Sequence, residues 1–298
     1  MPEVTEPKPA MLLQQPWEMK PLGLNSALAF IALTLISASQ LPGQQSFAER
    51  FTAHNSTMTA FQPALITPLV GADPRLIQYA RFSVAHQYTP AGTETISYGN
   101  NRGGGIVIGK RFEFDVLPPP YIVHNSSAQD GIGDTATVLK YRIASGNAEN
   151  GNFDIAASIG HCFATGSHKN GAASNSFTPT LIGAYAFHRF DVISSIGGTL
   201  PTSKTDTQGR SIAWTALAQA HATRHVWFEV ENNATYYIGG IRDGKMQNFI
   251  TPAAFYVVRP KEWKATHPYF IIDVGMQIAT SSFHTYNHNL ISETRIIF

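Results

Sequence analysis

The sequence is poor in cysteine and in charged residues. Its 298 residues include one cysteine, Cys162, and only 14% Asp, Glu, Lys and Arg. A single cysteine excludes an intramolecular disulfide and any zinc site built from several cysteines. The formal net charge of +1 provides no basic surface for nucleic acid, so we expect no nucleic-acid partner.

Long hydrophobic runs are also missing from most of the chain. Beyond residue 44 there is no run of 18 consecutive apolar residues, so we expect no helical membrane anchor there. The mean hydropathy of −0.09 argues against a helical membrane protein. It remains compatible with a membrane β-barrel, because barrel strands are apolar on only one face.

The N-terminal part has the pattern of a secretory signal peptide. Met19 and Lys20 precede an apolar run at residues 27–36, and the small residues Ser37, Ala38 and Ser39 follow it. This run is too short for a transmembrane helix, but it has the length of a signal-peptide core. We therefore predict an upstream extension and signal peptide over residues 1–44, with cleavage between about residues 39 and 45.

Residues 45–75 form a second region with its own composition. The stretch 46–62 could form one short amphipathic helix, and Pro63, Pro68 and Pro74 then favour an extended or irregular chain. Two interpretations are open for this region: a periplasmic segment outside the barrel, or a plug inside it. We favour the periplasmic segment.

From residue 76 to 298 the sequence alternates between apolar and polar residues. In the stretch 226–238, Val226, Phe228 and Val230 share one parity, while Glu229 and Glu231 share the other. A period of two is typical of strands with one apolar and one polar face. The segments run for roughly 10–14 residues, enough to cross a bilayer. The turns between them are alternately short and long, as in outer-membrane barrels.

The sequence therefore predicts an all-β, antiparallel, up-and-down transmembrane barrel of about twelve strands, with an N-terminal signal peptide. Its C-terminus is expected on the periplasmic side, and a barrel whose N-terminus is also periplasmic needs an even strand number. The predicted strands are 76–89, 92–99, 104–117, 134–145, 153–165, 177–188, 190–202, 211–223, 226–238, 248–259, 268–280 and 289–298. Lys110 fits this scheme poorly, since it falls on the lipid-facing parity of 104–117.

The other parity supplies charged side chains to the interior of the barrel. The lumen-facing candidates are Arg81, Arg111, Glu113, Asp115, Lys140, Arg142, Asp154, Asp191, His221, Glu229, Glu231, Asp273, Glu293 and Arg295. Both signs occur in similar number, so this lumen could bind polar solutes or close by pairing its own charges. Turn lengths further predict that His188 lies opposite Asp191, that His221 lies opposite Glu229, and that Gln219 lies opposite Glu231.

Residues 130–135, Asp-Gly-Ile-Gly-Asp-Thr, precede the run Leu-Lys-Tyr-Arg-Ile at 139–143. This pair of motifs resembles a bacterial outer-membrane family labelled MetA-pathway phenol-degradation or transporter-like protein. Thr178-Pro179, residues 200–202 and residues 239–251 are similar to its later strands. The resemblance implies an outer-membrane barrel with a transport role, but no particular substrate. A last strand ending in Phe298 also resembles the signal that the barrel assembly machinery reads.

These observations favour an outer-membrane channel or transporter-like barrel for small solutes, in contact with lipid and lipopolysaccharide. A membrane-embedded hydrolase and a structural or adhesive barrel are the alternatives. His161 and His188 could serve a hydrolase, but no serine lies in a Gly-x-Ser-x-Gly elbow. His284 and His288 lie in a predicted loop, where we expect no metal site. We expect no cofactor and no catalytic residue.

Overall fold

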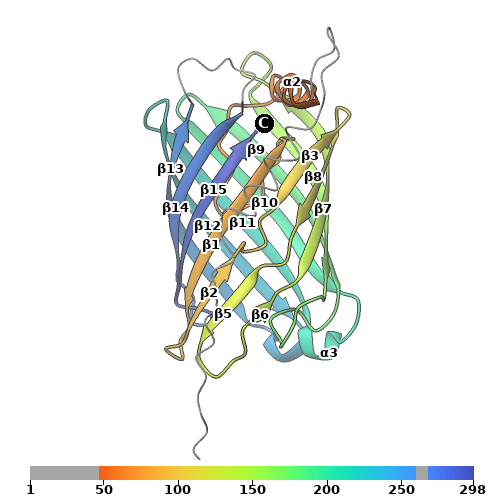
Figure 1. Ribbon diagram of the computed structural model, residues 1–298, viewed down its shortest axis with the longest axis vertical. Helices are drawn as coiled ribbons and strands as arrows, with labels where there is room; N and C mark the ends of the chain where they lie inside the picture. The colour runs from red at the N-terminus through yellow and green to blue at the C-terminus, as the bar shows by residue number, and fades with distance from the viewer. Residues whose placement is uncertain (1–46, 260–267) are drawn as a thin grey trace, which may run out of the picture. The chain divides into compact units, whose positions relative to one another are not determined.

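Figure 1 shows the computed structural model, in which residues 47–259 and 268–298 are described. The predicted signal peptide lies outside these residues. The strands are β1 (Tyr79–Tyr88), β2 (Glu94–Tyr98), β3 (Gly104–Ile108), β4 (Phe112–Leu117), β5 (Tyr121–Asn125), β6 (Gly131–Ile132), β7 (Thr135–Gly146), β8 (Phe153–Phe163), β9 (Ser176–Phe187), β10 (Phe190–Pro201), β11 (Arg210–His221), β12 (Val226–Ile238), β13 (Met246–Val258), β14 (Tyr269–Ala279) and β15 (His288–Ile297). The helices are α2 (Phe47–Thr59), α3 (Thr205–Gln208) and the 3₁₀ turn η1 (Gly240–Arg242).

These strands form one closed antiparallel barrel of twelve positions. β2 continues into β3, β4 into β5, and β6 into β7, so each of these pairs occupies one position in the wall. The barrel closes where β1 pairs with β15, from Tyr79 opposite Ile297 to Tyr88 opposite His288. The twelve-strand prediction is confirmed.

The division of the first strands differs from the prediction. The expected strand 104–117 is two strands, β3 and β4, joined by a tight turn at residues 109–111. Gly109 has a φ of 64°, which suits such a turn. Lys110 is therefore an exposed turn residue, and its poor fit to a lipid-facing position disappears.

Connections at the two ends of the barrel differ in length. At one end, the short-turn end, the connections that consist entirely of described residues span 109–111, 147–152, 188–189 and 222–225. At the other, the long-loop end, they include residues 164–175, 202–209, 239–245 and 280–287. The C-terminal residue Phe298 lies at the short-turn end, beside helix α2 (Figure 1).

The two faces of the wall have opposite chemistry. On β12, Phe228 and Val230 are 52% and 55% exposed, whereas Glu229 and Glu231 are 2% and 0% exposed. Apolar side chains point outward in the same way on the other long strands; examples are Leu181, Phe190, Ile196 and Ile272. A continuous apolar exterior around a closed wall is what a hydrocarbon environment requires of a barrel. Among the helices in the described part of the chain, none has the length and apolar character to cross a membrane.

Candidate functional site: the lumen and its N-terminal segment

Residues 62–78 lie inside the barrel, so of the two interpretations for this region the structure supports the plug rather than the external periplasmic segment. Leu65, Ile66, Leu69, Leu76 and Ile77 are all buried. Ile66, Leu69 and Ile77 pack against wall residues on one side of the barrel, which include Phe255, Ile271 and Ile291. Leu65 packs on another side against Ile182, Ile193 and Leu217, and Leu76 packs with Met58 and Val107. We call residues 62–78 the lumen segment.

The lumen segment is held in shape by a salt bridge within itself. The Arg75 guanidinium binds the Asp73 carboxylate, with Nη2–Oδ2 at 2.6 Å and Nε–Oδ1 at 3.0 Å. The same guanidinium donates to the Leu65 carbonyl and the Thr67 hydroxyl. Burial alone would raise the pKa of Asp73, but the adjacent Arg75 charge and its hydrogen bonds lower it to about 2. The salt bridge between Asp73 and Arg75 therefore persists throughout the physiological pH range.

Carboxylates of β12 bind the backbone N–H groups of the lumen segment. Glu229 Oε1 accepts from Leu69 N at 3.0 Å. Glu231 accepts from Val70 N and Gly71 N, both at 2.8 Å. Buried backbone groups need partners, and a segment that joins no sheet must find them in side chains. The buried glutamates of the wall supply them.

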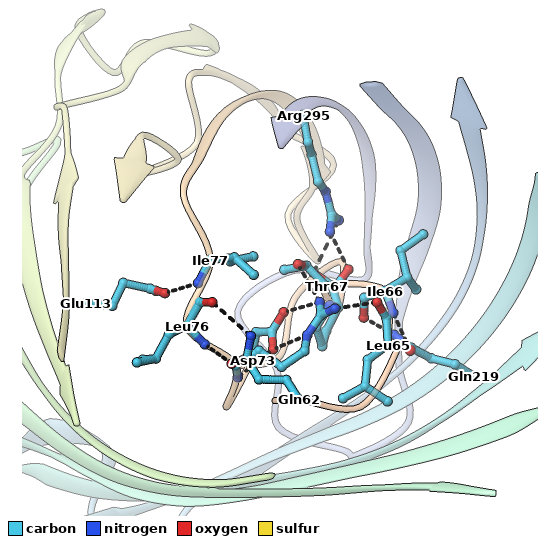
Figure 2. Close-up of polar contacts among 12 residues, drawn as sticks. Gln62, Leu65, Ile66, Thr67, Asp73, Leu76, Ile77, Glu113, Gln219 and Arg295 are labelled. Atoms are coloured by element: carbon cyan, nitrogen blue, oxygen red, sulfur yellow. Dashed lines mark hydrogen bonds and ion pairs between the residues drawn. The ribbon is translucent and has the colours of Figure 1, made fainter. Parts of the chain in front are cut away.

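Arginines bind the carbonyl groups of the same segment. Arg295 donates to the Thr67 and Pro68 carbonyls, the latter at 3.2 Å, and Arg81 also reaches Pro68. Figure 2 shows Arg295 pointing at the turn that carries Thr67. The Leu69 carbonyl accepts from Arg102. Cations thus face carbonyls and carboxylates face N–H groups, as electrostatic complementarity demands.

Other wall residues hold the two ends of the lumen segment. Gln219 exchanges hydrogen bonds with the backbone of Ile66, with its Nε2 donating to the carbonyl at 2.8 Å. Glu113 Oε2 accepts from Ile77 N at 2.6 Å (Figure 2). Glu113 also pairs with Lys140, whose ammonium donates to the Arg75 carbonyl at 3.0 Å. Both ends of the lumen segment are therefore hydrogen-bonded to the wall, as its middle is.

The wall charges also pair with one another. Glu293 lies within 2.6 Å of Arg81 Nε, 2.5 Å of Arg295 Nε and 3.2 Å of Arg102 Nε. Arg295 Nε is also 2.9 Å from an Asp273 oxygen. Buried charges are tolerated only when they are paired in this way.

The structure places most of the fourteen predicted lumen residues inside the barrel. Eleven are buried: Glu113, Asp115, Lys140, Arg142, Asp154, Asp191, Glu229, Glu231, Asp273, Glu293 and Arg295. Arg81 and His221 are partly exposed and also bind interior partners. Arg111 is different: it is an exposed turn residue whose Nη1 donates to the hydroxyl of Tyr141 at 2.8 Å. Its assignment to the lumen was wrong because the strand turns at residues 109–111.

The predicted cross-strand pairs are wrong in register, although the residues of the two β11–β12 pairs do lie on the lumen face. Gln219 lies opposite Glu229, and His221 opposite Trp227, so the β11–β12 register is shifted by two residues. Asp191 lies opposite Ala186, because the turn consists of His188 and Arg189. His221 does reach a carboxylate, but it is Asp191 on the neighbouring strand β10.

The sequence did not single out Gln62, Gln78 or Arg102, although each binds the lumen segment or belongs to it. Gln62 Nε2 donates to the Leu76 carbonyl at 3.0 Å and so ties the two ends of the segment together. Gln219 was predicted on the lumen face, opposite Glu231, but was not among the lumen-facing candidates because it carries no charge. Arg102 lies between two predicted strands, where parity gives no signal.

The Gly-Asp motif at residues 133–134 organises a loop at the long-loop end. Asp134 accepts hydrogen bonds from Gly166 N at 2.9 Å and Ala172 N at 2.6 Å. A Cβ at Gly171 would lie 2.1 Å from Asp134 Oδ1, so this approach requires glycine. The motif therefore fixes the conformation of residues 164–175.

The histidines considered for metal binding or hydrolysis have other partners. His284 bonds the Ser281 carbonyl at 2.8 Å and Asn287 Oδ1 at 2.9 Å. His161 stacks on Phe177, with ring centroids 4.5 Å apart. Over residues 47–259 and 268–298, no group of three His, Cys, Asp or Glu side chains could hold a metal ion.

No family model matches the chain, and no curated protein matches its sequence. Solved structures do match. The COG4313 outer membrane channel from Pseudomonas putida F1 has 14% identity and a TM-score of 0.51, over 78% of this chain and 100% of that chain. A NanC porin structure has 8% identity and a TM-score of 0.48, over 73% and 98%. The fold is that of an outer-membrane barrel.

Proposed function

We propose that the protein is an outer-membrane channel for small solutes and that the lumen segment closes it in the state described. The observation that carries this proposal is the set of charged wall side chains bound to the backbone of residues 67–71. A barrel built only as a scaffold could fill its interior with its own side chains. In this barrel, charged side chains of the wall instead bind a separate segment that enters from one end.

The orientation follows from the connections. Outer-membrane barrels place short turns in the periplasm and long loops outside the cell. The short-turn end is then periplasmic, and both the lumen segment and helix α2 are reached from that side. Cavities of about 650 Å³ at the long-loop end and about 750 Å³ at the short-turn end flank the segment. Solute passage from one to the other requires the lumen segment to move.

The wall charges then have two roles. In the closed state they neutralise the polar backbone of the segment. When the segment leaves, the same glutamates and arginines line a path with both signs of charge, which suits polar solutes of either charge. The resemblance of residues 130–143 to the family labelled MetA-pathway phenol degradation supports the same class of function and names no substrate.

Conductance across planar bilayers tests the proposal. In a background with Cys162→Ser, the pair Gly71→Cys and Thr215→Cys should tether the lumen segment, because a Cβ at Gly71 would lie 3.2 Å from Thr215 Cγ2. We expect the oxidised pair to show no openings and the reduced pair to match wild type. Deleting residues 63–71 should give continuous conductance.

A matched control places a disulfide on the outer face of the wall, away from the lumen segment. Ile212→Cys and Tyr236→Cys join outward-facing residues that lie opposite each other on β11 and β12. Oxidation there should leave conductance unchanged. The proposal fails if the deletion variant folds and does not conduct, or if the oxidised tether conducts like wild type.

A further inference from the structure

The cavity at the long-loop end has an unusual lining of hydroxyl groups. Thr199, Ser211 and Tyr237 lie opposite one another on β10, β11 and β12, so their side chains form one row across three strands. Adjacent strands are about 4.8 Å apart, so these three side chains leave the wall at that spacing. Ser176 and Thr235 add two more to the same cavity of about 650 Å³.

These five hydroxyl groups have no hydrogen-bond partner in the described part of the chain. Within residues 47–259 and 268–298, none of the side chains of Ser176, Thr199, Ser211, Thr235 and Tyr237 makes a hydrogen bond to another protein group. Elsewhere in the same loops hydroxyls are used: Ser174 Oγ bonds the Ser203 carbonyl at 2.9 Å and Gln208 Oε1 at 2.6 Å. The cavity hydroxyls are therefore available to a ligand.

The charge at the cavity has one sign. Arg242 and Arg210 line it, and no Asp or Glu does. The Arg242 guanidinium lies over the Tyr237 ring, 5.3 Å from its centre, and forms no ion pair with a described carboxylate. The acidic residue next to it, Asp243, instead accepts a hydrogen bond from Gly239 N at 2.6 Å. Arg242 thus presents an uncompensated positive charge beside the hydroxyl row.

The loops that frame the cavity are held by contacts with one another. A Cβ at Gly240 would lie 2.4 Å from Gly209 N, so the two loops touch backbone to backbone. Thr202 N also donates to the Asn175 carbonyl at 2.8 Å, which joins a third loop to them. A preformed site loses less free energy to ordering when a ligand binds.

We propose that this cavity is a binding site for a small organic anion that carries several hydroxyl groups, a polyhydroxy carboxylate. Arg242 takes the carboxylate, and the row of Thr199, Ser211 and Tyr237 pairs with the ligand's hydroxyls. Only the further step, that the bound anion is the solute that crosses the barrel, rests on the proposed channel function.

Binding to the folded protein in detergent micelles, measured by titration calorimetry, tests the site with three probes. D-gluconate carries both the charge and the hydroxyls, sorbitol carries only hydroxyls, and hexanoate carries only the charge. We expect D-gluconate to bind at least about tenfold more tightly than either of the others, because each lacks one set of contacts.

Three variants assign the contacts. Arg242→Gln should weaken D-gluconate binding by about tenfold. Thr199→Val with Ser211→Ala should remove the preference for D-gluconate over hexanoate. Arg189→Gln, an exposed arginine at the short-turn end, should change nothing. All variants should keep the wild-type heat-modifiable band in gel electrophoresis, since these side chains lie at the ends of the barrel.

The proposal is overturned if D-gluconate binds no more tightly than hexanoate or sorbitol, or if Arg242→Gln binds it like wild type. Titrating the oxidised Gly71→Cys/Thr215→Cys protein separates the two hypotheses. D-gluconate binding to this closed protein supports the site even if no variant conducts. If the wild-type protein does not bind D-gluconate while the tethered and deletion variants show the expected conductance, the site is contradicted and the channel proposal stands.

Discussion

The wall of the barrel has two regions built in different ways. From β7 to β15 each strand has 10 to 13 residues, with one bulge between Arg142 and Ala144 in β7, and only the position of β7 has a short additional piece, β6. Between β1 and β7 two positions are each divided into pieces of five or six residues, β2 with β3 and β4 with β5. We call these regions the continuous wall and the interrupted wall.

The difference shows what the interruptions achieve. At the first, Asn100 and Asn101 adopt left-handed φ values of 43° and 50°, and Arg102 reaches inward to the Leu69 carbonyl and to Glu293. At the second, Pro118, Pro119 and Pro120 cannot donate to a strand ladder. The continuous wall contacts the lumen segment through residues within its strands. In the interrupted wall, one contact comes from Arg102, which lies at the first break itself.

The largest expected effect compares lipid-facing positions in the two regions. Val230 in the continuous wall and Val116 in the interrupted wall are 55% and 45% exposed and lie similarly far from the short-turn end. Arginine at either position should lower the free energy of unfolding by about 2–4 kcal/mol if both lie near the bilayer midplane. Urea titration in liposomes measures this, with Ile241→Arg in an exposed loop as the control. A neutral Val116→Arg would place the interrupted wall outside the hydrocarbon.

The same division explains which parts of the fold could be predicted from the sequence. In the continuous wall, alternation in long segments such as residues 226–238 predicted both the strands and their buried faces. Parity survives a shift of two residues, so Glu229 was assigned to the correct face although its partner is Gln219 and not His221. Register depends on turn geometry, which the composition of residues 222–225 does not determine.

In the interrupted wall and the lumen segment, periodicity carries little information. A run of alternating residues from 104 to 117 looks like one strand because the three-residue turn at 109–111 preserves parity on both sides. Residues 62–78 have no period at all. Their position depends on backbone groups bound by distant side chains, such as Glu231 with Gly71, and local sequence cannot reveal such contacts.

A second prediction concerns Asp73, whose salt bridge shapes the segment that both wall regions hold. Its pKa is lowered to about 2, so its contribution to stability is complete above its ordinary value and is lost as the pH falls toward 2. Asp73→Asn should therefore lower the free energy of unfolding by about 2 kcal/mol at pH 7. The difference from wild type should shrink between pH 4 and 2. A pH-independent difference would contradict this, and Asp206→Asn in an exposed loop serves as the control.

A third prediction contrasts one glycine in each region. A Cβ at Gly103 would lie 2.0 Å from the Val116 carbonyl oxygen and 2.6 Å from Pro118 Cδ, whereas one at Gly183 would have nothing within 4 Å. Gly103→Ala must shift backbone at the interruption, so it should cost about 1–3 kcal/mol. Gly183→Ala should stay within about 0.5 kcal/mol of wild type. If the two variants were equally stable in urea titration, the backbone at the interruption would be able to shift without a measurable loss of stability.

The smallest expected effect lies at the seam where the two regions meet. Asn55 of α2 binds both sides of this seam: its Oδ1 accepts from Gln78 N at 2.9 Å, just before β1, and its Nδ2 donates to the Phe298 carbonyl, just after β15. Phe51 packs edge-on against the Phe298 ring, with centroids 5.4 Å apart. Asn55→Ala leaves the buried Gln78 N–H without this partner, so we expect a loss of about 1 kcal/mol.

Thr57→Ala on the exposed side of the same helix is the matched control, because it makes a comparable change in helix propensity without touching the seam. The temperature at which the folded band disappears in gel electrophoresis should fall for Asn55→Ala and stay unchanged for Thr57→Ala. If both variants behave alike, β1 and β15 are held together by their own ladder, and α2 contributes nothing to closing the barrel. If only Asn55→Ala is less stable, the helix fastens the interrupted wall to the continuous one at the end from which the lumen segment enters.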